Sequence, residues 1–227
     1  MNARRSLGVA RRPHGLSVVE LLVGMALALV AVAAALKLLA GQVESQRRLL
    51  LEARLHQDLR AAADLVARDL RRAGWWASAV AATAGPPRAN PYRAIAPASG
   101  AAQSSIGYSY SRDAVENDTL DANESFGLRL SAGALQLQDG SGGWQQLTDP
   151  ATVLVTRLVV TPRLRSVDLG HLCTPACSSA DAACPRLELR SYDLLIQARA
   201  AGDASVVREV RESVRVRNDQ LSSVGCP

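Results

Sequence analysis

Hydrophobic residues form one long run near the start of the chain. Residues 15–36 read GLSVVELLVGMALALVAVAAAL, which is long enough for a helix to span a bilayer. The run contains one ionisable residue, Glu20. A charged side chain costs on the order of 3 kcal/mol at the membrane centre, and intramembrane acids usually face a partner rather than lipid. The position of Glu20 therefore predicts a partner for its carboxylate. The alternative is an ordinary signal anchor whose acid lies near the membrane interface.

A helical period continues beyond this run without proline as far as Ala73. Charged residues separate apolar ones that recur at three- or four-residue spacing, namely Leu51, Leu55, Leu59, Ala62, Val66 and Leu70. This pattern predicts one long helix that is apolar in its first half and amphipathic in its second. Gly74 follows as the expected C-cap.

The rest of the chain has the pattern of strands. Residues 77–124 are rich in Ala, Ser, Pro and Gly and predict a long connector. The strands predicted are 104–110, 126–130, 135–137, 153–160, 187–198 and 206–216. A helix over 203–213 is the alternative, but the density of valine favours a strand. We expect an α+β fold, in which the second half of the N-terminal helix packs on an antiparallel β-sheet head.

The residues before the hydrophobic run are basic and indicate the topology. Residues 1–15 carry four arginines and no acid, which places the N-terminus in the cytoplasm and everything after Leu36 across the membrane. The formal net charge is +5, but beyond Gly15 the chain has 22 basic and 21 acidic residues. We therefore expect no nucleic-acid binding. A signal peptide would be cut after its apolar region, whereas the plausible cut here, after Gly15, precedes it and leaves the helix on the mature protein.

A glycine, an apolar helix and a glutamate five residues into the mature chain resemble the type IV prepilins and pilin-like proteins. In that family Phe usually follows the glycine, and this chain has Leu16 instead. The resemblance implies that a prepilin peptidase cuts after Gly15 and methylates the new amine of Leu16. It also implies that Glu20 pairs with the N-terminal amine of a neighbouring subunit during fibre assembly.

Two further segments narrow the resemblance. The run RLHQDLRAAADLVARDLRRAGWW resembles the minor pilins called PilW, and the ending VRVRN resembles the last strand of those proteins and of the J-class type II secretion pseudopilins. The resemblance implies a minor pilin that helps initiate type IV pilus assembly and enters the fibre at or near its tip. A J-class pseudopilin and a membrane-anchored periplasmic binding module are the alternatives.

The resemblance also implies partners and a location. The expected partners are prepilin peptidase, other minor pilins, the major pilin, the inner-membrane pilus assembly platform and a tip adhesin. The expected location is the bacterial inner membrane, with one span and a periplasmic head, and then the fibre. The expected organisation is a cleaved leader (1–15), a transmembrane and fibre-core helix (16–36), its amphipathic continuation (37–76), a connector (77–124) and a β-sheet head with a disulfide-bearing loop (125–227).

Four cysteines lie in the last quarter of the chain: Cys173, Cys177, Cys184 and Cys226. The periplasm is oxidising, so we expect disulfides there. Four cysteines allow three pairings, and the sequence does not choose among them; we favour one short bridge within 173–184 and one that ties Cys226 back. A zinc site with His171 is the alternative, but the spacing differs from that of paired CxxC knuckles.

The remaining candidate chemistry is sparse. An acidic cluster over 113–124 has oxygen ligands of the kind that calcium prefers, but it lacks EF-hand spacing, and we interpret it as a solvated loop. No histidine or cysteine has an identifiable activating partner. We therefore expect a structural protein, not an enzyme, with no cofactor and no resident metal.

Overall fold

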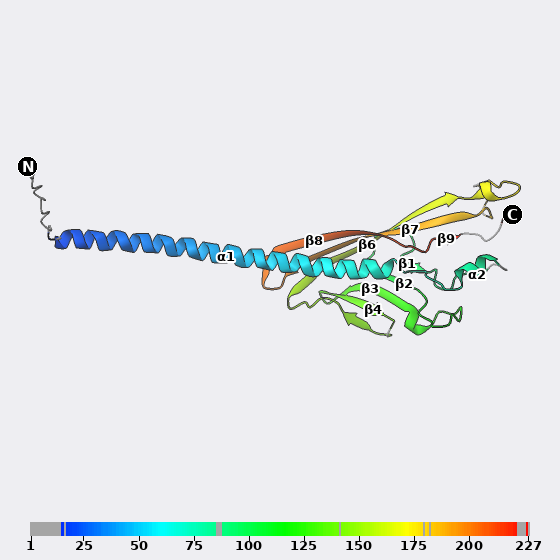
Figure 1. Cartoon of the computed structure of the whole chain (residues 1–227), viewed down its shortest axis with the longest axis horizontal. Coiled ribbons are helices and arrows are strands. Elements are labelled where there is room, and N and C mark those ends of the chain that lie inside the picture. The colour runs from blue at the N-terminus through cyan, green and yellow to red at the C-terminus, as the bar shows by residue number, and fades with distance from the viewer. Residues whose placement is uncertain are drawn as a thin grey trace, which may run out of the picture. The chain divides into compact units, whose positions relative to one another are not determined.

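The computed structural model describes residues 15, 17–84, 88–140, 142–178, 180–181, 183–221 and 226. Its helices are α1 (Val18–Leu70) and α2 (Ala79–Ala84), with short 3-10 helices η1 (Ala122–Glu124) and η2 (Gly170–Leu172). Its strands are β1 (Ile95–Ala96), β2 (Ser105–Ser109), β3 (Ser125–Ser131), β4 (Ala134–Asp139), β5 (Trp144–Gln146), β6 (Val153–Asp168), β7 (Arg186–Ala200), β8 (Asp203–Arg215) and β9 (Gln220–Leu221) (Figure 1). The chain divides into two compact units, the N-terminal unit (Met1–Arg48) and the head (Leu49–Pro227).

The described part of the N-terminal unit is an exposed apolar helix. α1 begins after Ser17, whose Oγ accepts a hydrogen bond from the Val19 amide at 3.3 Å and so caps the helix. Every described residue of this unit is exposed, and the helix is long and apolar enough to cross a membrane. Exposing so much apolar surface to water is unfavourable, so lipid or other apolar helices have to cover it. The apolar first half of the predicted helix is confirmed.

In the head, the second half of α1 buries one side. The buried residues follow the predicted spacing, and they are Leu55, Leu59, Ala62, Ala63, Val66, Ala67 and Leu70. Fully burying one leucine contributes about 1.5–3 kcal/mol, so this stripe is a main source of stability for the helix. Arg54, Asp58 and Arg60 lie between these positions and are exposed. The amphipathic second half is therefore confirmed.

The first sheet has five antiparallel strands in the order β1-β2-β3-β4-β5. The predicted strand near residues 104–110 is β2. The predicted strands 126–130 and 135–137 are β3 and β4, which form a hairpin with Leu128 opposite Leu137. The two-residue turn between them, Ala132 and Gly133, has φ of 49° and 77°, which suits a tight hairpin. A Cβ on Gly133 would lie 2.4 Å from Leu154 Cδ1, so this turn is close-packed against β6.

The second sheet has the order β6-β7-β8, and β9 also pairs with β7. β8 is a strand, and the helical alternative for 203–213 is wrong, because its residues pair with β7 from Ala200↔Asp203 to Ser191↔Arg215. β6 continues eight residues past its predicted end at Val160, as far as Asp168. Most side chains of this extension are exposed on both faces, so no alternation of apolar and polar residues marked it.

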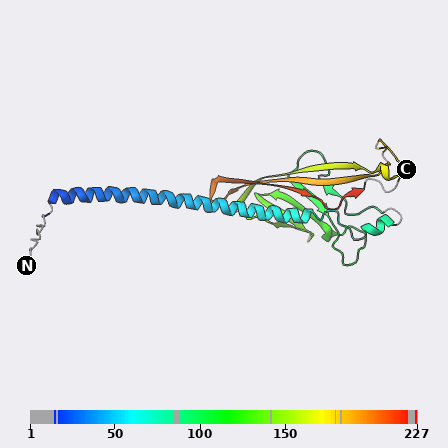
Figure 2. The same cartoon turned by 45° about the horizontal axis from the view of Figure 1, so that its top comes forward.

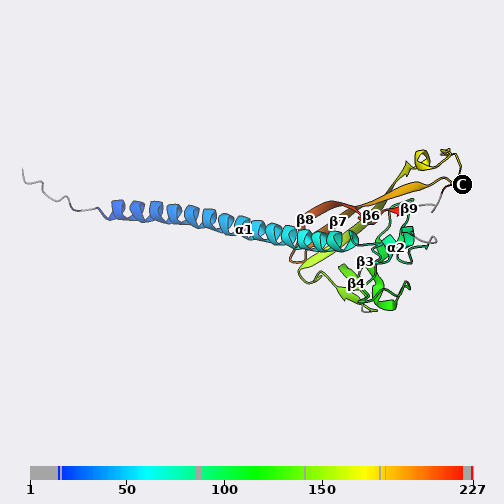
Figure 3. The same cartoon turned by 45° about the vertical axis from the view of Figure 1, so that its right-hand side comes forward.

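One hydrophobic core joins the second half of α1 to both sheets. It contains Leu59 of α1, Leu128 of the five-stranded sheet and Leu194 of the four-stranded sheet. The two sheets also meet where Gln103 and Val160 exchange backbone hydrogen bonds of 2.9 and 2.7 Å. Figures 2 and 3 show the second half of α1 lying along the strands of the head. The predicted α+β fold is confirmed, and the division of the strands into two sheets is a feature that their pattern did not predict.

Candidate functional site

The first candidate site is the start of α1, where Glu20 lies in the first turn. Gly15 is exposed ahead of the helix, and Leu16 lies outside the residues that the structure describes. A carboxylate in the first turn of a helix gains about 0.3–1 kcal/mol from the helix dipole. That gain is smaller than the cost, on the order of 3 kcal/mol, of the same charge at the centre of a membrane. The helix dipole therefore does not offset the free-energy cost of placing the Glu20 charge in apolar surroundings.

No cation in the described part of the N-terminal unit reaches Glu20. The next described basic residue along α1 is Lys37. At about 1.5 Å of rise per residue it lies roughly 25 Å away along the helix. A partner for the Glu20 carboxylate has to come from another chain or from residues outside the described ones.

The second candidate site is the end of α1, which the segment between β8 and β9 holds in place. The Asn218 amide donates hydrogen bonds to the carbonyls of Arg72 and Ala73 at 3.1 and 3.0 Å. The backbone amide of Arg217 donates to the carbonyl of Arg71 at 3.1 Å. Carbonyls at the end of a helix have no partner within it, so these bonds satisfy groups that would otherwise need water. We call this set of bonds the helix-end tie.

Gly74 completes the end of the helix. Its φ of +74° lies in the left-handed region that favours glycine, and its amide donates to the Ser109 carbonyl of β2 at 2.8 Å. The Asn90 side chain donates to the Gly74 carbonyl at 2.8 Å. An added Cβ would lie 3.2 Å from Arg190 Nη2, so the space beside Gly74 is also restricted. The expected C-cap therefore connects α1 to the five-stranded sheet.

Asp69 links the same part of α1 to strand β2. Its carboxylate accepts hydrogen bonds from the hydroxyls of Tyr108 and Tyr110 at 2.6 and 2.8 Å. Burial, with the nearby Asp69 charge, raises the pKa of both tyrosines above their ordinary value, so both stay neutral donors. The Tyr110 ring stacks on the Phe126 ring, with centroids 3.9 Å apart. The guanidinium carbon of Arg72 lies 4.3 Å from the centre of the same Tyr110 ring. In the sequence, Asp69 is one of the charged residues that separate the apolar positions of the helix.

The acidic cluster holds a loop against the head. Asp118 accepts hydrogen bonds from Trp76 Nε1 at 2.8 Å and from Arg88 at 2.9 Å. Hydrogen bonds from Ser78 and Trp76, with the charge of Arg88, lower the pKa of Asp118. Glu116 accepts hydrogen bonds from the Ala77 amide and the Tyr92 hydroxyl. The carboxylates of Asp118 and Glu116 therefore accept hydrogen bonds from other groups of the same chain. The described residues contain no cluster that could hold a metal ion.

Glu124 is a fully buried acid in the same loop. Its carboxylate accepts hydrogen bonds from the Arg112 amide at 2.8 Å, the Asp121 amide at 2.8 Å and the Tyr92 hydroxyl at 3.3 Å. A buried carboxylate is tolerated when such donors replace its water. Glu124 therefore has a structural role that its sequence context did not indicate.

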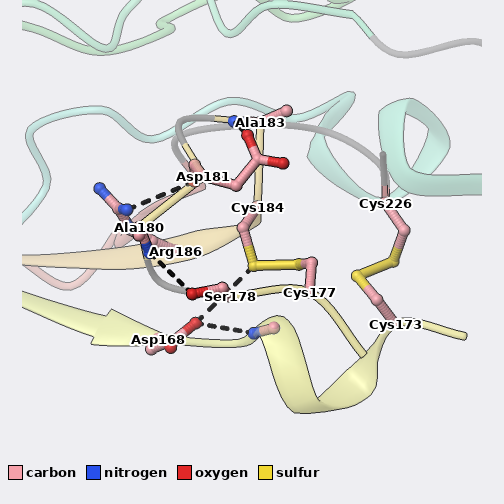
Figure 4. Close-up of a disulfide and its surroundings, with 11 residues drawn as sticks. Asp168, Cys173, Cys177, Ser178, Ala180, Asp181, Ala183, Cys184, Arg186 and Cys226 are labelled. Carbon is pink, nitrogen blue, oxygen red and sulfur yellow. Dashed lines mark hydrogen bonds between the residues drawn. A yellow bond between two sulfur atoms is a disulfide. The ribbon is translucent and has the colours of Figure 1, made fainter. Parts of the chain in front are cut away.

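Two disulfides hold the loop between β6 and β7 (Figure 4). The short disulfide joins Cys177 and Cys184, and the long disulfide joins Cys173 and Cys226 across 53 residues. This is the pairing that the sequence analysis favoured. Because all four sulfurs are in disulfides, no thiolate is left to form the alternative zinc set with His171.

The three tryptophans have different surroundings. Trp76 is buried and contacts Tyr92 in a small apolar cluster. Trp144 is half-buried, with the Arg129 guanidinium 4.1 Å from the centre of its ring. Trp75 is 44% exposed and lies outside the core.

An apolar helix that continues into a head of antiparallel sheets defines a class, the pilin-like α+β proteins. Proteins of this class have a structural role. A scan against protein families matches residues 48–216 to the family described as PpdB, prepilin peptidase-dependent protein B. The match covers most of the chain, and the chain belongs to this family. Searches of curated proteins and of solved structures each gave no significant match.

Proposed function

We propose that this protein is a minor pilin that helps to initiate type IV pilus assembly and is then incorporated into the fibre, at or near its tip. The observation that carries the proposal is the isolation of Glu20. It lies in an exposed apolar helix with no described cation within reach along that helix. The family's dependence on prepilin peptidase, stated in its description, supports processing of the chain at its N-terminal end.

In this proposal prepilin peptidase cuts after Gly15 and methylates the new amine of Leu16. The carboxylate of Glu20 then pairs with the N-terminal amine of a neighbouring subunit. A buried charge is tolerable when it is paired, and only the correct axial position brings the two groups together. The pair therefore sets the register between adjacent helices while their apolar surfaces pack in the fibre.

The proposal includes a place and a set of partners. The N-terminus lies in the cytoplasm and the head in the periplasm before assembly. The partners are the other minor pilins, the major pilin, the inner-membrane assembly platform and an adhesin at the tip. Within the head, the helix-end tie and Asp69 fix the second half of α1 to the sheets.

The test replaces Glu20 by alanine and compares it with Glu44→Ala, a second exposed acid on the same helix. We expect Glu20→Ala to abolish recovery of the protein in sheared fibres while its level in the membrane is unchanged. Glu44→Ala should leave both unchanged. Normal recovery of the Glu20→Ala protein in fibres would contradict the proposal.

A J-class pseudopilin of type II secretion is the second candidate. The Arg-Asn ending resembles that class, and in this chain Asn218 caps the helix end. Purification of the full-length protein from the inner membrane, followed by identification of the bound subunits, separates the two candidates. Minor pilins and a tip adhesin support the pilus, whereas secretion pseudopilins support the second candidate.

A further inference from the structure

A groove lined by arginines lies at the C-terminal end of α1, within the head. Its volume is about 400 Å³. Its lining residues are Arg68, Arg71, Arg72, Trp75, Arg217 and Asn218, and we call it the arginine groove. No acidic side chain is among these lining residues.

The helix-end tie gives the arginine groove a fixed base. Arg217 and Asn218 donate hydrogen bonds to carbonyls of residues 71–73, just past the end of α1. These bonds hold the arginines from the helix and Arg217 at a fixed spacing. Arg72 is oriented by the Tyr110 ring, which lies 4.3 Å from its guanidinium carbon. A surface that is ordered before binding loses less conformational entropy when a ligand arrives.

Two of the four guanidiniums are available to a ligand. Arg68 and Arg217 are exposed and have no side-chain hydrogen bond or ion pair with any residue that the structure describes. Arg71 lies 3.6 Å from Glu212, and such a partly exposed pair contributes little. The groove therefore carries positive charge that the surrounding head only partly compensates.

The end of the helix does not cancel this charge. A helix C-terminus is equivalent to about half a negative charge. Four guanidiniums outweigh it, and the helix-end tie already satisfies the carbonyls of Arg71, Arg72 and Ala73. The lining of the groove therefore carries a net positive charge.

We propose that the arginine groove binds an acidic segment of a partner protein chain. Guanidinium groups bind carboxylates through two parallel hydrogen bonds, and the exposed indole of Trp75 offers an apolar surface beside them. A nucleic acid is disfavoured, because phosphate backbones need an extended basic surface and the chain beyond Gly15 has nearly equal numbers of basic and acidic residues. All lining residues of the groove belong to the head.

The test measures fluorescence anisotropy with the purified full-length chain in a neutral detergent. The probes are a labelled glutamate peptide with a central phenylalanine, its lysine counterpart and a single-stranded DNA of similar net charge. The variant is Arg68→Ala/Arg217→Ala. The matched control is Arg157→Ala/Arg165→Ala, which removes two exposed arginines of β6 outside the groove.

We expect the glutamate peptide to bind, and the lysine peptide not to bind. Loss of two charge-assisted contacts should weaken binding about tenfold or more in the groove variant, and less than about twofold in the control. Trp75→Ala should weaken binding without changing its dependence on salt. The proposal is overturned if both double variants lose affinity equally, if the DNA binds as tightly as the peptide, or if the glutamate peptide does not bind at low salt.

Discussion

Asp69→Ala should destabilise the head strongly, because one carboxylate holds two buried tyrosine hydroxyls. The hydroxyls of Tyr108 and Tyr110 lie 2.6 and 2.8 Å from it. A hydrogen bond to a charged group contributes about 1.5–3 kcal/mol, and the variant leaves both hydroxyls without this acceptor. Asp69 is itself half-buried, so we take the lower end for each bond and expect a loss of about 3 kcal/mol in the free energy of unfolding.

A double-mutant cycle separates this effect from a general loss of packing. In a Tyr108→Phe/Tyr110→Phe background, Asp69→Ala should cost about 1 kcal/mol or less, because no hydroxyl is left unpaired. The assay is urea unfolding of the full-length chain in detergent, followed by tryptophan fluorescence. Asp64→Ala is the control, since Asp64 is an exposed acid on the same helix, and it should change stability by less than about 0.5 kcal/mol.

An additive cycle would contradict a role for these hydrogen bonds in stability. If Asp69→Ala cost the same with tyrosines and with phenylalanines, the hydrogen bonds would contribute nothing to the attachment of α1 to β2. A coupling of about 2 kcal/mol supports them.

Three further predictions use the same unfolding assay. Asn218→Ala removes two hydrogen bonds from the helix-end tie and should cost about 1–2 kcal/mol; a change near zero would show that water replaces the amide fully. Replacing both cysteines of the long disulfide by alanine should cost about 4 kcal/mol, against about 2.5 for the short disulfide, because loop entropy grows with loop length, and the reverse order would count against this account. The pKa of Asp118 is lowered in the folded state, so its contribution is present above its unfolded pKa and is lost as pH falls below about 4. Asp118→Asn should flatten this acid-side loss, and an unchanged pH profile would contradict the assignment.

The parts of the fold with a local repeat were predictable from the sequence. The spacing of Leu55, Leu59 and Val66 identifies the buried side of α1, because a helix turns with a fixed period. The alternation around Leu128 and Leu135 identifies the hairpin for the same kind of reason. The extension of β6 to Asp168 had no such signal, since it depends on pairing with β7 rather than on burial.

The contacts of the candidate sites were less predictable. Asp69 looks like any polar residue of an amphipathic helix until β2, about 40 residues further on, brings two tyrosines to it. The acids of residues 113–124 suggested calcium as an alternative, because the sequence does not reveal that Trp76 and Arg88 donate hydrogen bonds to Asp118. The arginine groove had one local signal, three arginines beside Trp75, but its fourth arginine comes from the opposite end of the chain.

The proposed function requires that the chain is cut after Gly15 and that Glu20 then pairs with the amine of a neighbouring subunit. The most direct measurement is the intact mass of the protein from cells with and without prepilin peptidase. We predict a mature chain that begins with N-methylated Leu16 when the peptidase is present, and an uncut precursor when it is absent. A chain that still begins at Met1 in cells with active peptidase would contradict the account.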